Sequence, residues 1–240
     1  MVLARLNRGV TNALNLAYVE GLGEVIQQVR GDPDVRALVV ASSNDKFFSI
    51  GFDIPELFEL NRDRFGGFYR AFNRACLDLY TLPKPTVAAI TGHAIAGGCI
   101  LALCCDYRFI AEGRKLMGLN EVKLGVPVPY LGDRVLHVLS GTRQARRVME
   151  SGEFYGPEES LEMGMVDQVW PLEQVVDQAV EKAEALGSLP GTAYGMIKRN
   201  RVEVVEAEVV ARKEEKEGAF IECWYSDEAR ERLREAMEKF

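Results

Sequence analysis

The chain has 240 residues, of which 48% are apolar and 27% are charged, and its formal net charge at pH 7 is −7. These values are ordinary for a soluble globular protein, and the length permits one large domain or one domain with a small appendage. The acidic balance argues against a nucleic-acid partner, which needs a basic surface. It is compatible with a small anionic ligand, because a few local cations suffice to bind one.

The longest apolar stretch covers residues 95–105, contains two glycines and stops at Asp106. It is much shorter than the roughly 20 residues that a membrane helix requires, and the chain does not open with a charged and then apolar secretory leader. The five cysteines are odd in number and lack the spacing of metal ligands. We therefore expect buried, reduced thiols in a cytoplasmic protein with no membrane association, no disulfide and no metal site.

The first half of the chain alternates between predicted strands and predicted helices. The strands are expected over residues 1–6, 35–41, 86–91 and 107–111. The helices are expected over residues 15–30, 61–79 and 97–104, with a loop over residues 47–53. The strand at 35–41 is almost entirely apolar, as expected of a strand that is covered on both faces. This alternation predicts crossover connections between parallel strands, and therefore an α/β fold.

The texture of the sequence changes after Pro190. Residues 192–239 alternate apolar and charged residues in helical register, and Ser226 followed by Asp227 predicts the start of a last helix near Glu228. The charged residues of this tail are those of a solvated helical face.

The apolar residues of the tail, among them Phe220 and Trp224, need a surface to pack against. We therefore divide the chain into a core of residues 1–190 and a C-terminal helical region of residues 191–240. This region is expected to pack on the core or on a neighbouring subunit.

Two glycine-bearing segments carry most of the functional information: residues 48–53, Phe-Ser-Ile-Gly-Phe-Asp, and residues 92–99, Gly-His-Ala-Ile-Ala-Gly-Gly-Cys. Each can present a free backbone N–H at the end of a strand, and glycine allows a sharp turn and the close approach of a ligand. Two such N–H groups that converge on one point stabilise a negative charge on a carbonyl oxygen. Paired glycines before an apolar run are also typical of plain helix–strand packing, so the order and spacing of the segments must decide.

These segments resemble the two oxyanion motifs of the crotonase (enoyl-CoA hydratase/isomerase) superfamily. Residues 6–15 are similar to the start of that family and residues 164–169 to its late strand region, so the resemblance covers nearly the whole chain in order. It implies a core of ββα turns wound into a spiral, followed by a C-terminal helical region used in trimerisation. It also implies acyl-CoA thioester substrates, whose thioester oxygen is held by the backbone N–H groups of Phe52 and Gly97.

Carboxylates at two places decide the reaction type in this family, because hydration of a double bond uses two glutamates. The first lies two residues after the last glycine of the second motif, where this sequence has Ile100, and the second matches Glu121. One carboxylate beside an apolar, water-excluding side chain can still take a proton from C2 of a 3-enoyl thioester and return it at C4. The resemblance therefore favours a Δ3,Δ2-enoyl-CoA isomerase with Glu121 as its general acid/base.

Other polar residues near these motifs are secondary candidates. For His93, a hydrogen-bonded structural role is favoured over a catalytic one. Tyr130 and Asp133 follow the catalytic glutamate, and in some relatives this loop supplies the acid group. We place Ile50, Asp53 and Ile100 at the substrate, together with Tyr130, although Asp53 more readily ties down its own turn.

Many members of the family carry a lysine just after the first oxyanion motif to meet the phosphates of CoA, whereas this sequence has Pro55 in that neighbourhood. Lys46, Arg62 or a lysine near the C-terminus is left to supply the charge, and we place Lys46 among the substrate-binding residues. CoA enters as part of the substrate, so we expect no separate cofactor.

The sequence is thus interpreted as a crotonase-fold acyl-CoA enzyme of fatty acid metabolism, with an isomerase favoured. The alternatives are an enoyl-CoA hydratase, another enolate reaction such as thioester hydrolysis or decarboxylation, and a non-catalytic CoA-thioester-binding protein. Glu121 together with both oxyanion segments argues against the last, because binding alone needs no base. We expect a homotrimer or a dimer of trimers, in keeping with closed symmetry.

Overall fold

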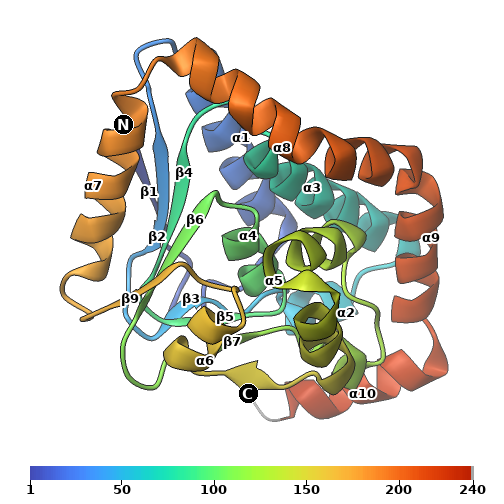
Figure 1. The fold of residues 1–240 in the computed structure, drawn as a ribbon. Coiled ribbons are helices and arrows are strands. Elements are labelled where there is room, and N and C mark those ends of the chain that lie inside the picture. Colours follow the sequence, from blue (N-terminus) through green and yellow to red (C-terminus); the bar gives the residue numbers. More distant parts are fainter. Residues whose placement is uncertain (239–240) are drawn as a thin grey trace.

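Two sheets form the centre of the computed structural model, which describes residues 1–238 (Figure 1). The larger sheet has the strand order β1-β2-β4-β6-β9, and all of its neighbouring strands are parallel. Its strands are β1 (Val2–Leu6), β2 (Leu38–Ser42), β4 (Thr86–Ile90), β6 (Tyr107–Ala111) and β9 (Gln168–Trp170). The smaller sheet has the order β3-β5-β7-β8 and consists of β3 (Phe47–Ser49), β5 (His93–Ile95), β7 (Met117–Gly118) and β8 (Phe154–Tyr155).

The chain repeats one unit, in which a strand of the larger sheet is followed by a short strand of the smaller sheet and then by helix. The helices that follow β3, β5 and β7 are α2 (Ile54–Phe58) with α3 (Arg62–Tyr80), α4 (Gly97–Leu103), and the 3₁₀ turn η1 (Glu121–Leu124) with α5 (Tyr130–Ser151). Because β3, β5 and β7 are parallel neighbours, the residues that follow them come together at one edge of the smaller sheet. The ββα units that the resemblance implied are therefore present.

Helices cover both faces of the larger sheet, which explains why its central strands are apolar throughout. Every residue of β2 and β4 is buried. Alternate strand residues face α7 (Val175–Gly187) on one side, and the others face the main core with α1 (Leu16–Gly31) and α3. This alternation is the two-residue period of a strand, and Figure 1 shows α7 alone on its side of the sheet.

Three helices follow the core: α8 (Gly191–Ala211), α9 (Lys213–Trp224) and α10 (Asp227–Met237), while the short α6 (Pro157–Glu162) precedes β9. The predicted start of the last helix is confirmed, since the Ser226 side chain accepts the N–H of Ala229 as its N-cap. The region packs on its own chain, because Trp224 stacks on Phe65 with ring centroids 4.3 Å apart. The division into domains at residue 190 stays a prediction, and Lys239 and Phe240 lie outside the described residues.

The predicted strands and helices of the first half are confirmed, but the short elements β3, α2, β5 and β7 were not predicted. The second strand begins at Leu38 rather than at residue 35, and the predicted loop over residues 47–53 contains the short strand β3. The cysteine prediction is correct for four residues and wrong for Cys223, which is partly exposed on α9 and donates its thiol to the carbonyl oxygen of Gly125. None of the helices in residues 1–238 has the length and apolar character needed to cross a bilayer.

A buried ion cluster at Asp106 fastens α8 to the larger sheet at the start of its interior strands β4 and β6. The Asp106 carboxylate accepts the backbone N–H and the hydroxyl of Thr86 at 2.9 and 3.1 Å. It also pairs with Lys198 of α8 at 2.7 Å and with Arg201. Asp106 and Lys198 are buried, and burial lowers the pKa of the Lys198 ammonium. Removing the carboxylate would leave the Lys198 charge buried without its counter-ion.

We expect Asp106→Asn to lower the free energy of unfolding by about 3–5 kcal/mol, because loss of one partner leaves a buried charge uncompensated. The measurement is urea unfolding followed by circular dichroism. Glu222→Gln is the control, since it breaks only the exposed pair between Arg62 and Glu222 and should cost no more than about 1 kcal/mol. Equal effects of the two substitutions would contradict the role given to Asp106.

Candidate active site

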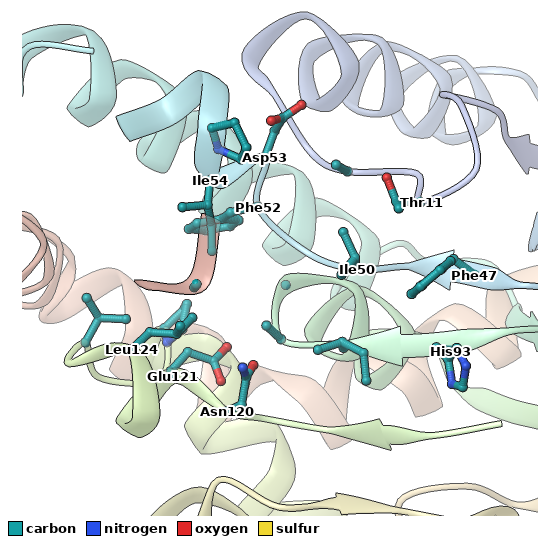
Figure 2. A pocket seen from close by; sticks show the side chains of 18 of the residues that line it. Thr11, Phe47, Ile50, Phe52, Asp53, Ile54, His93, Asn120, Glu121 and Leu124 are labelled. Carbon is teal, nitrogen blue, oxygen red and sulfur yellow. The ribbon is translucent and has the colours of Figure 1, made fainter. Parts of the chain in front are cut away.

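A cavity of about 580 Å³ lies where the segments after β3, β5 and β7 meet (Figure 2). Most of its wall is apolar and consists of Phe47, Ile50, Phe52, Ile54, Ile95, Leu116, Leu124, Val126, Phe154, Phe220 and Trp224, with small residues between them. The polar side chains of the wall are those of Arg8, Thr11, Asp53, His93, Asn120 and Glu121. An apolar cavity with a few polar groups that converge is typical of a small-molecule site.

Phe52 lines the cavity, and its backbone N–H group has no hydrogen-bond acceptor within residues 1–238. Leu14 pairs with the residues on either side of it: its N–H donates to the carbonyl oxygen of Gly51 at 2.7 Å, and its carbonyl oxygen accepts the N–H of Asp53 at 2.9 Å. The N–H of Phe52 therefore points away from Leu14, and no acceptor in residues 1–238 pairs with it.

Gly97 supplies a second free N–H group beside the first. It is the first residue of α4, so its N–H has no acceptor within the helix. The two segments lie close together: a Cβ atom added to Gly51 would lie 2.9 Å from the nitrogen of Gly97, and one added to Gly97 would lie 3.1 Å from the Phe52 ring. Gly51 also has φ +93°, a conformation that favours glycine. Two adjacent backbone donors of this kind suit a developing oxyanion.

Gly98 has the packing role that was the alternative for paired glycines. A Cβ atom there would lie 2.2 Å from the carbonyl oxygen of Ser49, so α4 can approach β3 this closely only with glycine at that position. The two neighbouring glycines therefore serve different ends: Gly97 carries the donor, and Gly98 lets the helix that presents it sit against β3.

Glu121, the first residue of η1, places a carboxyl group in the same cavity, and Figure 2 shows it beside Asn120 and Leu124. The residue is buried, and its Oε2 atom has no hydrogen-bond partner within residues 1–238. Burial raises the pKa of the carboxyl group to about 8. A carboxyl group with a pKa near neutrality can both accept and return a proton, which is the property of a general acid/base.

Asp53 also lies in the cavity wall, but its carboxylate is committed elsewhere. It accepts the N–H of Glu56 as the N-cap of α2 and forms an ion pair with Arg8 at 2.6 Å. Within the described chain, Asp53 and Glu121 are the carboxylates of this wall. Glu121 is thus the one without a salt-bridge partner among residues 1–238.

His93 is held by the backbone, in agreement with the structural role favoured for it. Its Nδ1 atom accepts the N–H of Leu116 at 3.0 Å, so a neutral ring carries its proton on Nε2. Burial and the charges of Lys115, Arg114 and Lys46 lower the pKa of the imidazole. His93 is therefore a neutral group at the cavity wall, surrounded by cations.

Of the predicted substrate-binding residues, Ile50 and Asp53 lie in the wall, and Ile100, Tyr130 and Lys46 do not. Ile100 is fully buried against α5, where a Cβ atom on Gly132 would lie 2.8 Å from its side chain. It fills the core behind the cavity.

Tyr130, the first residue of α5, instead turns to α8, and its hydroxyl donates to the carboxylate of Glu208 at 2.5 Å. Tyr130 therefore does not line the cavity, where the sequence had placed it. Lys46 precedes β3 and belongs to the cations around His93, so its role toward CoA stays a prediction.

The C-terminal helices form part of the cavity wall, which the sequence patterns did not predict. Phe220 and Trp224 of α9 and Ala236 of α10 border the cavity, as does Asn120, which precedes Glu121. The apolar residues of the tail signalled that it packs on something, but no local pattern said on what.

Comparison with known proteins agrees with this geometry. A family model described as enoyl-CoA hydratase/isomerase matches residues 1–240. The chain belongs to this family. It is an enzyme of the crotonase superfamily, as the resemblance of its motifs implied, and it has the fold of that superfamily.

Two curated relatives and one solved structure illustrate the similarity. The enoyl-CoA delta isomerase 1, mitochondrial, of Homo sapiens is 29% identical over 95% of this chain and 76% of that protein. The short-chain-enoyl-CoA hydratase of Clostridium acetobutylicum is 28% identical over 95% of this chain and 87% of that protein. The crystal structure of human mitochondrial delta3-delta2-enoyl-CoA isomerase superimposes with a TM-score of 0.95, at 28% identity, over 99% of this chain and 92% of that one.

The raised pKa of Glu121 predicts a pH-dependent cost in stability. Its carboxyl group has a pKa of about 8 when folded against a reference value of 4.5, so between these values the unfolded chain binds fewer protons and stability falls as pH rises. Glu121→Gln removes this cost. The variant should match the unaltered protein below pH 4.5 and exceed it by about 3–5 kcal/mol above pH 8.

The measurement is the free energy of unfolding in urea at pH 5.5 and pH 8.5 for both proteins. Glu158→Gln, at the exposed start of α6, is the control and should show no comparable gain. A constant difference between Glu121→Gln and the unaltered protein at the two pH values would show that this carboxyl group titrates normally.

Proposed function

We propose that the protein is a Δ3,Δ2-enoyl-CoA isomerase, which shifts a 3-enoyl-CoA to a 2-trans-enoyl-CoA. The observation that carries the proposal is one buried carboxyl group without a salt-bridge partner in residues 1–238, in the same cavity as two free backbone N–H groups. The named isomerase relatives support it. CoA enters as part of the substrate, and the proposal includes no other cofactor.

In the proposed reaction, the thioester oxygen accepts the N–H groups of Phe52 and Gly97. The ionised Glu121 removes a proton from C2, and the electron pair moves onto the thioester oxygen as a dienolate. The two donors oppose this charge, and loss of one such donor typically costs about 3–4 kcal/mol of barrier. The protonated Glu121 then delivers the proton to C4, the double bond forms between C2 and C3, and the enzyme returns to its starting state.

The alternative is an enoyl-CoA hydratase, and it is favoured by the hydratase from Clostridium acetobutylicum among the relatives. Hydration asks for a second group that activates water. Ile100 stands at the place of the first of the two family glutamates, and the other carboxylate of the wall, Asp53, is paired with Arg8. A cavity with one available carboxyl group suits a proton shuttle better than the addition of water.

Cations around His93 are candidates for the phosphates of CoA. Lys46, Arg114 and Lys115 lie close enough to lower the pKa of this histidine, which borders the cavity. Arg62, one of the other cations weighed from the sequence, forms an ion pair with Glu222. We therefore assign the phosphates to the cluster that includes Lys46.

The first test is an assay of a panel of 3-enoyl-CoA substrates with product analysis. Glu121→Gln keeps the size of the side chain and removes the base, so isomerisation should fall by about 10²–10⁴-fold while acyl-CoA binding survives. Glu217→Gln is the matched control, because Glu217 is a buried glutamate on α9 outside the cavity wall. Its turnover should stay close to that of the unaltered protein.

Two results would contradict the assignment. Near-normal turnover of Glu121→Gln would mean that another group is the base. Hydration of 2-enoyl-CoA by the unaltered protein as fast as any isomerisation would favour the hydratase alternative.

We also propose a homotrimer or a dimer of trimers. Four apolar side chains of α8 are exposed to between 57 and 71%, and they are Met196, Ile197, Val204 and Val210. A contact with another copy would cover such residues. Sedimentation velocity at micromolar concentration should show a trimer or hexamer, and a stable monomer would rule this assembly out.

A further inference from the structure

Residues 11–14, which precede α1, form hydrogen bonds to the first oxyanion segment, residues 48–53. Asn12 lies within residues 11–14. The carbonyl oxygen of Thr11 accepts the N–H of Ile50 at 2.9 Å, and Leu14 makes the two hydrogen bonds that flank Phe52. Asn12, between Thr11 and Leu14, is completely buried and does not line the cavity. Whatever it does for the reaction must therefore act through its neighbours.

The carboxamide of Asn12 ties three parts of the backbone together. Its Nδ2 atom donates to the hydroxyl of Ser42 at 3.0 Å and to the carbonyl oxygens of Phe47 and Phe48 at 3.3 and 3.1 Å. Its Oδ1 atom accepts the N–H of Arg8 at 2.7 Å. The end of β2, the strand β3 and the N-terminal segment are thus joined through one side chain.

A second link runs from the backbone of Asn12 toward Phe52. The hydroxyl of Ser49 donates to the carbonyl oxygen of Asn12 at 2.8 Å and accepts the N–H of Gly51 at 3.1 Å. Gly51 supplies the carbonyl half of the peptide group that carries the Phe52 N–H. Both of its hydrogen-bonding groups are therefore held, one by Ser49 and the other by Leu14.

The backbone of Asn12 has a positive φ of 47°, which costs an L-residue about 1–2 kcal/mol and which asparagine tolerates better than most. In residues 1–238, the other non-glycine residue with positive φ is Ala96, directly before the second donor, Gly97. Strained backbone persists where surrounding contacts over-determine it, and it gathers at active sites. Here each strained residue stands next to, or is bonded to, the segment of one oxyanion donor.

We propose that Asn12 is a positioning residue of the oxyanion pair. Its carboxamide and backbone fix residues 47–51, and through them the peptide group of Phe52, so that the N–H meets the enolate oxygen in register with the N–H of Gly97. The inference rests on the proposed function in one respect: the anion is taken to be a thioester enolate.

The test uses Asn12→Gly, Ser49→Ala and a control on the full chain. Glycine adopts a positive φ without strain, so Asn12→Gly removes the carboxamide and keeps the backbone conformation accessible. Ser49→Ala cuts the second link and leaves Asn12 in place. The control, Val175→Ala, truncates a buried residue of α7 on the opposite face of the larger sheet, which affects stability only.

Two readouts separate positioning from stability, both taken at a temperature where every variant is folded. The first is kcat and KM on a 3-enoyl-CoA. The second is the fraction of a bound 3-oxoacyl-CoA that is present as enolate, measured from its ultraviolet absorbance. This probe reports the oxyanion pair without any turnover.

We expect Asn12→Gly to lower kcat by about 10²-fold, the cost of a misplaced catalytic group, with little change in KM and with a smaller enolate fraction. Ser49→Ala should change both readouts in the same direction, and Val175→Ala should change neither. Ser49→Ala also decides the matter if Asn12→Gly does not fold.

Unchanged kcat and enolate fraction in the folded variants would overturn the inference, as would the absence of bound enolate with the unaltered protein. An unaltered protein that forms the enolate but does not isomerise 3-enoyl-CoA would refute the proposed function alone.

Discussion

The backbone of residues 49–52 lies so close to the start of α4 that Gly51 and Gly98 have no room for a Cβ atom. A Cβ atom added to Gly51 would lie 2.9 Å from the nitrogen of Gly97, and one added to Gly98 would lie 2.2 Å from the carbonyl oxygen of Ser49. Two features of the fold hold these segments together. The parallel pairing of β3 with β5 sets the two segments side by side, and the bonds from residues 11–14 prevent the first segment from turning its N–H elsewhere. Because the donors belong to the backbone, their placement depends on the fold more than on which side chains surround them.

The lack of water around the cavity affects both parts of the proposed reaction, the proton transfer by Glu121 and the stabilisation of the enolate oxygen by the two N–H groups. Burial among apolar side chains keeps Glu121 protonated to a higher pH than usual. The same lack of water strengthens the attraction between an enolate oxygen and the N–H groups. Asp53 shows the opposite arrangement in the same wall, since Arg8 and the start of α2 occupy its oxygens. Two carboxylates in one cavity wall thus have different surroundings: Asp53 is paired with Arg8, and Glu121 has no ion-pair partner within residues 1–238.

Local patterns in the sequence correctly predicted those strands and helix ends that depend on the residues within them. The apolar run of β4 and the capping serine before α10 predict their elements directly. The two glycine segments predicted part of the cavity wall correctly, because the groups expected of them are backbone N–H groups, which do not depend on the direction of a side chain. The strands β3, β5 and β7 have only two or three residues each, too few to show a period, and β3 was taken for loop.

Side-chain direction and distant contacts were beyond those patterns. Ile100 and Glu121 were expected to face each other, but the turn of α4 sends Ile100 into the core against Gly132. The aromatic wall from α9 comes from residues far along the chain, so only the completed fold reveals it.

Residues that are far apart in the sequence line the cavity together. Arg8 and Thr11 line it from the N-terminal segment, and Trp224 and Ala236 line it from the last two helices. Contacts between such distant residues carry the largest loop-closure cost and tend to form late in folding. During synthesis, residues from Arg8 to Ala236 would have to leave the ribosome before this pocket could form. Recovery of activity after denaturation would then report completion of the whole fold, whereas recovery of helix content would report only its parts.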